Sequence, residues 1–62
     1  MEIQYSVVIN STGGGNVALV LRSWTVDEEG NQTQIASEVK TNISMAQALQ
    51  DAHAFVQEVD NG

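Results

Sequence analysis

The stretch VALVLRSWTV, residues 17–26, decides the fold of this chain. It opens with five apolar residues in a row and continues by alternation through Trp24 and Val26. The run is short, rich in β-branched residues and flanked by turn-forming residues, which predicts a buried central β-strand rather than a helix. Such a strand needs cover on both faces. In a chain of 62 residues one helix covers only one face of a sheet, so the second apolar face is the strongest functional indication in the sequence.

Two further strands are predicted, one on either side of this segment. Residues 3–9 alternate between apolar and polar side chains, which is the period of a half-buried strand. The glycine-rich segment Asn10–Asn16 favours a loose hairpin loop. Asp27–Asn31 favours a three-residue hairpin loop with Gly30 in the left-handed conformation, leading into a third strand over about residues 32–40.

Closing both turns at their ends sets a register for the three strands. Ile9 is expected to pair with Val17 across the first turn. Leu19 is expected to pair with Val39 across the second. Because side chains alternate along a strand, these pairings predict one apolar face directed at the core. Its members are Ile3, Tyr5, Val7, Ile9, Val17, Leu19, Leu21, Ile35 and Val39.

The C-terminal part is predicted to form a helix that begins at Met45. Ser44 and Gln47 have the spacing of a capping box, in which the two side chains satisfy amides at the helix start. Apolar residues then recur every three or four positions: Met45, Ala48, Leu49, Ala52, Phe55, Val56 and Val59. The predicted fold is therefore α+β, a single domain over residues 1–62. It is a three-stranded antiparallel β-meander with one C-terminal helix packed on one face.

The sheet face turned away from this helix is predicted to bind another protein. Contiguous exposed apolar patches mark interaction sites, and a tryptophan within one is a typical anchor. The residues expected to contact a partner are Trp24, Val20, Val26, Val8, Arg22, Glu38 and Glu28. Two versions are open, a heterologous partner and a symmetric homodimer with Trp24 near its centre. An exposed edge strand that accepts a strand from a partner is a further route to binding.

The charge of the chain narrows the choice of partner. Eight acidic residues oppose only Arg22 and Lys40, giving a formal net charge of −6. Nucleic-acid binders need clustered cations, so no direct nucleic-acid contact is expected. A basic protein, such as one that handles nucleic acid, would instead be steered toward this chain. The alternative is that the charge only keeps a small domain soluble.

No constellation of residues predicts catalysis, a metal site or a cofactor. His53 is the single histidine and there is no cysteine, so a transition-metal site would need carboxylates from distant elements. The glycine loop joins two strands and lacks the Lys-Ser/Thr of a phosphate-binding loop. The serines and threonines have no base at a telling spacing. We therefore expect a protein that is not an enzyme.

The sequence contains no targeting or membrane-spanning pattern that we can identify. The first residues lack the basic flank and apolar stretch of a signal peptide, and no apolar run approaches ~18 residues. We therefore expect a cytoplasmic protein without a membrane partner.

The order of elements resembles the N-terminal domain of HicB-type antitoxins. The segments that carry the resemblance are Tyr5–Ile9, the glycine-rich turn, Val17–Val20, Ile43–Leu49 and Ala52. Domains of that family are acidic βββα units that bind and block a small basic RNA-cleaving toxin. The resemblance thus implies an acidic inhibitor of another protein. Small phage-encoded inhibitors have a similar size and charge.

The predicted function is a non-catalytic acidic module that inhibits or regulates a protein partner, in the manner of an antitoxin or a phage inhibitor. The alternative is a structural or assembly protein whose second sheet face forms a homo-oligomer. A salt-sensitive association with a basic partner would favour the first, and a tight, salt-insensitive self-association the second.

Overall fold

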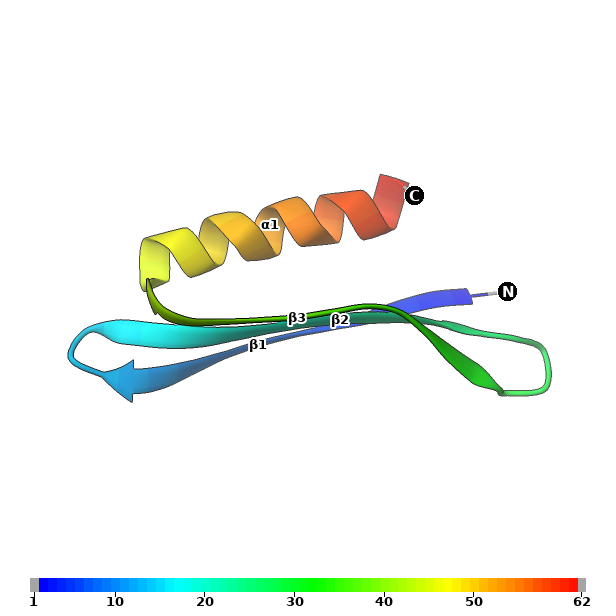
Figure 1. Ribbon diagram of the computed structural model, residues 1–62. Coiled ribbons are helices and arrows are strands. Elements are labelled where there is room, and N and C mark those ends of the chain that lie inside the picture. Colours follow the sequence, from blue (N-terminus) through cyan, green and yellow to red (C-terminus); the bar gives the residue numbers. More distant parts are fainter. Residues whose placement is uncertain (1, 62) are drawn as a thin grey trace.

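The computed structural model describes residues 2–61 and has the predicted βββα architecture. Three strands, β1 (Glu2–Gly13), β2 (Asn16–Val26) and β3 (Gln32–Ser44), precede one helix, α1 (Met45–Asn61). The strands form one antiparallel sheet in the order β1-β2-β3, so the segment that opened the sequence analysis is the central strand. The helix lies along one face of this sheet (Figure 1). The predicted fold class is confirmed.

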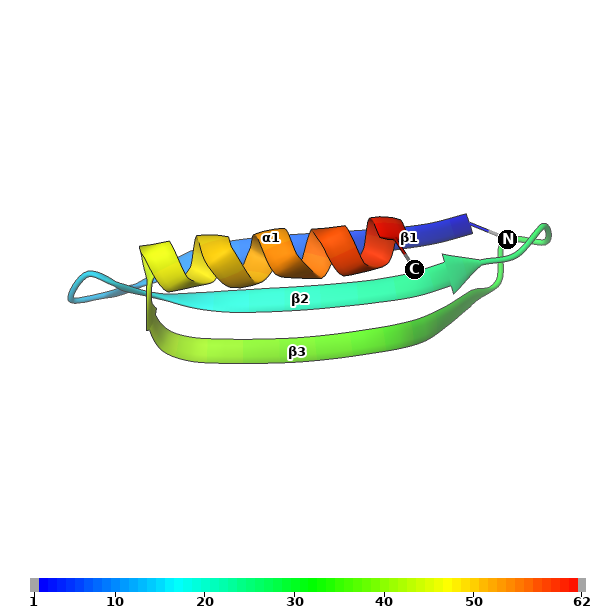
Figure 2. The ribbon, with the colours of Figure 1, turned by 90° about the horizontal axis from the view of Figure 1, so that it is seen from above.

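The molecule is a flat stack of two layers, with extents of 44, 20 and 11 Å. Figure 1 shows the layers edge-on, and no element within residues 2–61 covers the sheet face opposite α1. Seen from above, α1 runs over β1 and β2, and most of β3 lies beside it without cover (Figure 2). One helix is therefore too narrow to cover even one face of the sheet completely.

The core between the layers is small. Val17, Leu19 and Leu21 of β2 are buried against Ala48 of α1. The partly buried side chains packed around them are Val7, Ile9, Ile43, Ala52 and Phe55. Ile3 and Tyr5, also predicted for the core, are each 43% exposed because they lie along the edge of the sheet. Burial is therefore concentrated on the central strand.

The first hairpin is tighter than predicted, and its register differs by two residues. Ile9 pairs with Leu19 rather than with Val17. The chain reverses at Gly14 and Gly15, whose φ angles are 65° and 82°. Two consecutive positive φ angles are what the tightest hairpin turns require, and glycine adopts them without strain. Because a shift of two residues preserves the alternation, every side chain of β1 keeps its predicted face.

The second hairpin follows its predicted register only near the turn. Trp24 pairs with Gln34 as expected from the loop that Asp27 and Asn31 close, where the Asp27 N–H donates to the Asn31 carbonyl at 3.0 Å. A β-bulge follows: Ser23 pairs with Ala36, so Ile35 is an extra residue on β3. From that point the predicted pairs, including Leu19 with Val39, are wrong by one residue.

This one-residue shift exchanges the two faces of β3. Lys40 now lies opposite Leu19, on the side of α1, and Val39 lies opposite Val20, on the far side. Val39 is 62% exposed instead of forming part of the core, and Ile35 is 57% exposed. The predicted core positions of both residues are therefore wrong.

A second bulge near the end of β3 restores the original alternation. Val17 pairs with Ile43, which returns to the core. The residues between include Asn42, which has a positive φ of 60° and accepts a hydrogen bond from Asn16 Nδ2 at 2.8 Å. Asparagine is the residue that tolerates this conformation best after glycine. Two extra residues in β3 thus carry the chain to the start of α1.

The helix begins at Met45, as predicted. Ser44 Oγ accepts a hydrogen bond from the Gln47 N–H at 3.1 Å, which is the N-cap interaction. The Gln47 side chain does not complete a capping box in this structure, since its amide donates to Asp51 at 2.9 Å. Met45 and Leu49 belong to the predicted apolar stripe but remain 47% and 56% exposed.

Candidate protein-binding face

The sheet surface opposite α1, here called the outer face, is uncovered across all three strands (Figure 1). Val17, Leu19, Leu21 and Ser23 are buried on the side of α1. The residues that alternate with them along β2 therefore point to the outer face. These are Ala18, Val20, Arg22, Trp24 and Val26.

A row of three valines crosses the outer face. Val20 of β2 pairs with Val8 of β1 on one side and with Val39 of β3 on the other. Val8 is 40% exposed and Val39 is 62% exposed. Directly opposed β-branched side chains pack well across strands, so the row is a continuous apolar strip over the whole sheet. Sequence reasoning missed Val39 because its place depends on the bulge at Ile35.

Trp24 lies four residues beyond Val20 on the same face. Its indole Nε1–H donates to Gln4 Oε1 on β1 at 3.1 Å, and its ring is only partly buried. It lines a shallow hollow of about 360 Å³ with Arg22, Gln32 and Gln34. Because the polar atom of the ring is already satisfied, the ring can bury its remaining apolar surface against a partner without an unpaired donor.

The remaining predicted contact residues divide between this face and other surfaces. Arg22 is exposed between Ser6 and Ser37, and Val26 pairs with Glu2 and Gln32 at the end of the sheet. Glu28 lies in the turn after β2. Glu38 was predicted for the outer face and lies instead opposite Leu21, on the side of α1, because of the bulge at Ile35. The structure therefore places Val8, Val20, Arg22, Trp24 and Val26 on one surface and excludes Glu38 from it.

Charge is distributed unevenly between the two faces. Among residues 2–61, the charged side chains of the outer face are Arg22 near its middle and Glu2 at one corner. The acids Glu38, Asp51 and Glu58 line a groove of about 160 Å³ between α1 and β3. Asp27, Glu28 and Glu29 lie in the turn. Apart from Glu2, the outer face and the acidic side chains named here thus occupy separate surfaces.

Lys40 forms ion pairs with two of the acids in the groove between α1 and β3. Its Nζ lies 3.0 Å from Asp51 Oδ2 and 3.6 Å from Glu38 Oε1. The hydrogen bond between Lys40 and Asp51 raises the pKa of the Lys40 amine and lowers the pKa of the Asp51 carboxyl. This contact ties β3 to α1 and fixes which flank of the helix faces β3.

The turn acids have a structural role. Asp27 Oδ1 accepts hydrogen bonds from the N–H groups of Glu29 and Asn31, both at 2.9 Å. The hydrogen bond from the Asn31 N–H is the main cause of a lowered pKa of the Asp27 carboxyl. A carboxylate that accepts hydrogen bonds from nearby backbone N–H groups in this way stabilises the turn.

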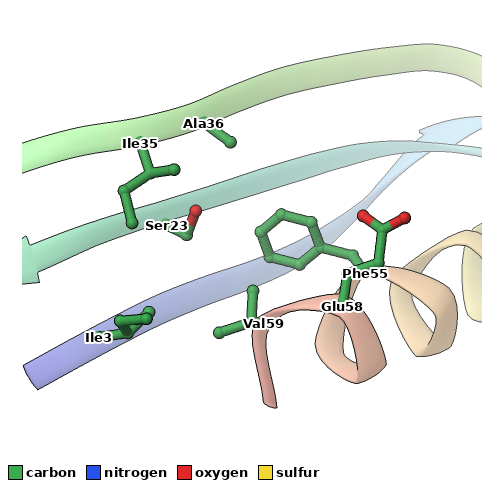
Figure 3. A pocket seen from close by; sticks show the side chains of 7 residues that line it. All are labelled: Ile3, Ser23, Ile35, Ala36, Phe55, Glu58 and Val59. Atoms are coloured by element: carbon green, nitrogen blue, oxygen red, sulfur yellow. The ribbon is translucent and has the colours of Figure 1, made fainter. Parts of the chain in front are cut away.

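A second groove opens where the end of α1 meets the sheet. It has a volume of about 270 Å³ and is lined mainly by apolar side chains (Figure 3). The lining residues are Ile3, Ser23, Ile35, Ala36, Phe55, Glu58 and Val59. Glu58 is the one ionisable group among them, so the groove has no pair of groups suited to acid–base chemistry.

Within residues 2–61 no three His, Asp or Glu side chains come together to hold a metal ion. His53 is exposed on α1. No helix in this part of the chain is long and apolar enough to cross a membrane.

Comparison of the chain with protein-family models, curated proteins and solved structures found no match. The resemblance to HicB-type antitoxins stays a prediction from the sequence pattern.

Proposed function

We propose that this chain is a non-catalytic protein-binding module that inhibits or regulates a partner protein through its outer face. One observation supports this proposal above others: the valine row Val8–Val20–Val39 and Trp24 share a sheet face that no part of residues 2–61 covers. A sheet normally buries its apolar face against another layer. A partner supplies that layer here.

Trp24 is the proposed anchor of the contact. A tryptophan side chain can bury up to about 250 Å² in an interface. If a partner covers about 80 Å² of the ring that remains exposed, the gain is about 2 kcal/mol at ~25 cal/mol per Å². That magnitude is typical of the few residues that dominate an interface. Val26 follows two residues further along β2, and the valine row Val8–Val20–Val39 lies on the other side of Trp24, with Arg22 between the row and the ring.

The partner we propose is basic. The net charge of −6 attracts a basic protein before the two surfaces touch. This long-range attraction does not require acids on the outer face itself, and most of them lie on the helix side and in the turn that contains Glu28. Such attraction acts on the association rate and is screened by salt. The apolar outer face then determines the dissociation rate. Association is therefore expected to slow at high salt while dissociation changes little.

The experiment is affinity capture with the tagged chain, followed by kinetics with the purified captured protein. Trp24→Asp is expected to abolish binding and leave the circular dichroism spectrum unchanged, since the ring lies outside the core. Gln57→Glu adds the same charge at an exposed position of α1 and is expected to bind as the wild type does. Binding that survives Trp24→Asp, or a captured partner that is acidic, would refute the proposal.

A second candidate is an assembly protein whose outer face packs against the outer face of another copy. The scarcity of acids on that face favours it, because two copies of a chain with a charge of −6 would meet there without strong repulsion. Self-association that persists at high salt and is lost in Trp24→Asp would support this candidate instead.

A further inference from the structure

Strand β1 forms one edge of the sheet and lacks the usual protection of an edge. Its residues Glu2–Ser11 pair with β2 in an unbroken register, and irregularity begins only at the hairpin. The strand contains no lysine, arginine or proline, and Glu2 is its only charge. Proteins normally protect a long edge with charges, prolines or bulges, because its free N–H and C=O groups pair readily with another strand.

The other edge of the sheet, β3, is better protected than β1 against pairing with another strand. Strand β3 has two bulges, and its length includes Glu38 and Lys40. Bulges break the regular spacing of N–H and C=O groups that a pairing strand needs. The two edges of this sheet are therefore not equivalent, and β1 is the one that is open to pairing.

The helix presents an apolar flank above this open edge. Asp51 reaches Lys40, so its side of α1 faces β3. Leu49 precedes Asp51 by two residues, which is about 200° around the helix axis, and so lies on the flank above β1. Met45 is one turn before Leu49, and Val56 is two turns after it. Leu49 is 56% exposed and Met45 47% exposed.

The helix flank and the strand together form an apolar border, with Met45 and Leu49 near the start of α1 and Ile3 and Tyr5 near the start of β1. Ile3 and Tyr5 point from β1 toward the helix layer, and each is 43% exposed. Among residues 2–61, four of the seven exposed large apolar side chains therefore lie along this one border: Ile3, Tyr5, Met45 and Leu49. Scattered exposed apolar residues need no explanation, but a border aligned with an open strand edge indicates a contact.

We propose that the occupant of this border is a second copy of the chain. The two β1 strands pair antiparallel about a two-fold axis at Val7, next to the midpoint of the regular segment Glu2–Ser11, so that residues of the same face lie opposite each other. The result is a six-stranded sheet in the order β3-β2-β1-β1-β2-β3, with both helices on the same face. Such a contact is self-complementary, because each copy offers the same strand and the same flank.

The placement of α1 supports this arrangement. Figure 2 shows α1 above β1 and β2, the part of the sheet that would lie next to the second copy. Because the flank of α1 that carries Leu49 faces outward above β1, the corresponding flanks of the two helices turn toward each other across the two-fold axis.

The charges are placed so that the copies do not repel at the contact. The acids near the border, Glu2 and Asp60, lie at the same end of the molecule, where β1 begins and α1 ends (Figure 1). Antiparallel pairing sets that end against the uncharged hairpin end of the other copy. The acids Glu38, Asp51 and Glu58 lie on the β3 side, away from the axis.

The pairing also completes a domain that is short of core. Only four apolar side chains are buried among residues 2–61, and the chain has no cysteine to form a disulfide. Oligomerisation is a common way to stabilise such a small domain. The outer face is not used by this dimer and continues across both copies. The inference is therefore independent of the proposed partner binding.

The test is the solution mass of the full chain by light scattering or sedimentation over a range of concentrations. We expect a dimer of twice 6.7 kDa. Leu49→Glu is expected to weaken dimerisation roughly 100-fold. The substitution occurs once in each copy, and each occurrence is expected to weaken the dimer about tenfold, which corresponds to about 1.4 kcal/mol. Gln57→Glu adds the same charge on the exposed side of α1 and is expected to remain dimeric.

Hydrogen exchange on the wild type tests the pairing of the two β1 strands without any substitution. In the proposed dimer the N–H groups of β1 that point away from β2, every second residue, become protected as the concentration rises. A monomer up to the solubility limit would overturn the proposal, as would unprotected outward N–H groups. A dimer that survives Leu49→Glu but dissociates in Trp24→Asp would also overturn it and place the contact on the outer face. A monomer that binds its partner refutes only the dimer, and a dimer that binds none refutes only the proposed function.

Discussion

Two valines provide a quantitative test of the bulge at Ile35. The sequence pattern predicts both Val17 and Val39 for the core, each as a partner of an apolar residue on the neighbouring strand. In the structure Val17 is 5% exposed and Val39 is 62% exposed. Replacing each by alanine removes the same atoms from two different environments, so the difference between the two free energies of unfolding measures the register directly.

The expected magnitudes follow from burial. Val17→Ala removes two buried carbons, about 1.6 kcal/mol at ~0.8 kcal/mol for each, and leaves a cavity, which brings the loss to about 2–3 kcal/mol. Val39→Ala loses only the buried share of the same side chain, about 0.6 kcal/mol, so its total stays below about 1 kcal/mol with the change in strand propensity included. A domain of this size has roughly 3–9 kcal/mol in all, so the first change is severe.

The assay is urea unfolding followed by circular dichroism, with wild type and both variants at one protein concentration so that any self-association contributes equally. The slopes with urea should agree, and only the midpoints should differ. Equal losses in the two variants, or a loss above about 1.5 kcal/mol in Val39→Ala, would refute the reasoning. That result would place Val39 in the core and remove the bulge at Ile35.

Three further predictions concern single contacts. The pKa of Asp51 is lowered from 3.8 and that of Lys40 raised from 10.5, so their pairing stabilises the fold between these values. The contribution is lost as the pH falls below 3.8 or rises above 10.5. Measured by urea unfolding, the free energy of unfolding of Asp51→Asn should therefore change less with pH near both values than that of the wild type. An equal pH dependence in the two proteins would contradict the pairing. Ser44→Ala should cost about 1 kcal/mol through the lost N-cap, measured by urea unfolding, whereas no loss would mean that Ser44 does not cap α1. Gly14→Ala should cost about 1–2 kcal/mol in the same assay because φ is 65°, although the space around the Cα is open; a neutral result would show that the turn relaxes.

The sequence was sufficient to predict the elements and their order. The alternation of residues 3–9, the apolar run of residues 17–21 and the spacing of the helix stripe are each repeated several times, so each signal survives local irregularity. Ser44 was recognised as a cap because capping depends on a single local hydrogen bond. The face of Trp24 followed from the alternation within β2, which contains no extra residue of its own.

The register was not predictable in the same way. Three consecutive glycines permit several hairpin loops, and only the positive φ angles of Gly14 and Gly15 identify the one that forms. Nothing in the local sequence marks Ile35 as an extra residue, because a bulge is selected by distant contacts. Those contacts include the pairing of Lys40 with Asp51 and the return of Ile43 to the core.

The bulge at Ile35 determines more than the packing of one strand. Without it, Glu38 would lie opposite Val20 on the outer face, and Val39 would lie toward the core. With it, the acid joins Asp51 and Glu58 on the helix side, and a valine takes its place beside Val20. A carboxylate in the centre of an apolar contact would have to be desolvated on binding, at a cost that a surface acid does not carry. One extra residue therefore moves Glu38 away from the apolar outer face and to the side of the other acids. The proposed function depends on that separation, because the acids near Glu28 and Lys40 then act at a distance while Trp24 and the valine row remain free of charge repulsion.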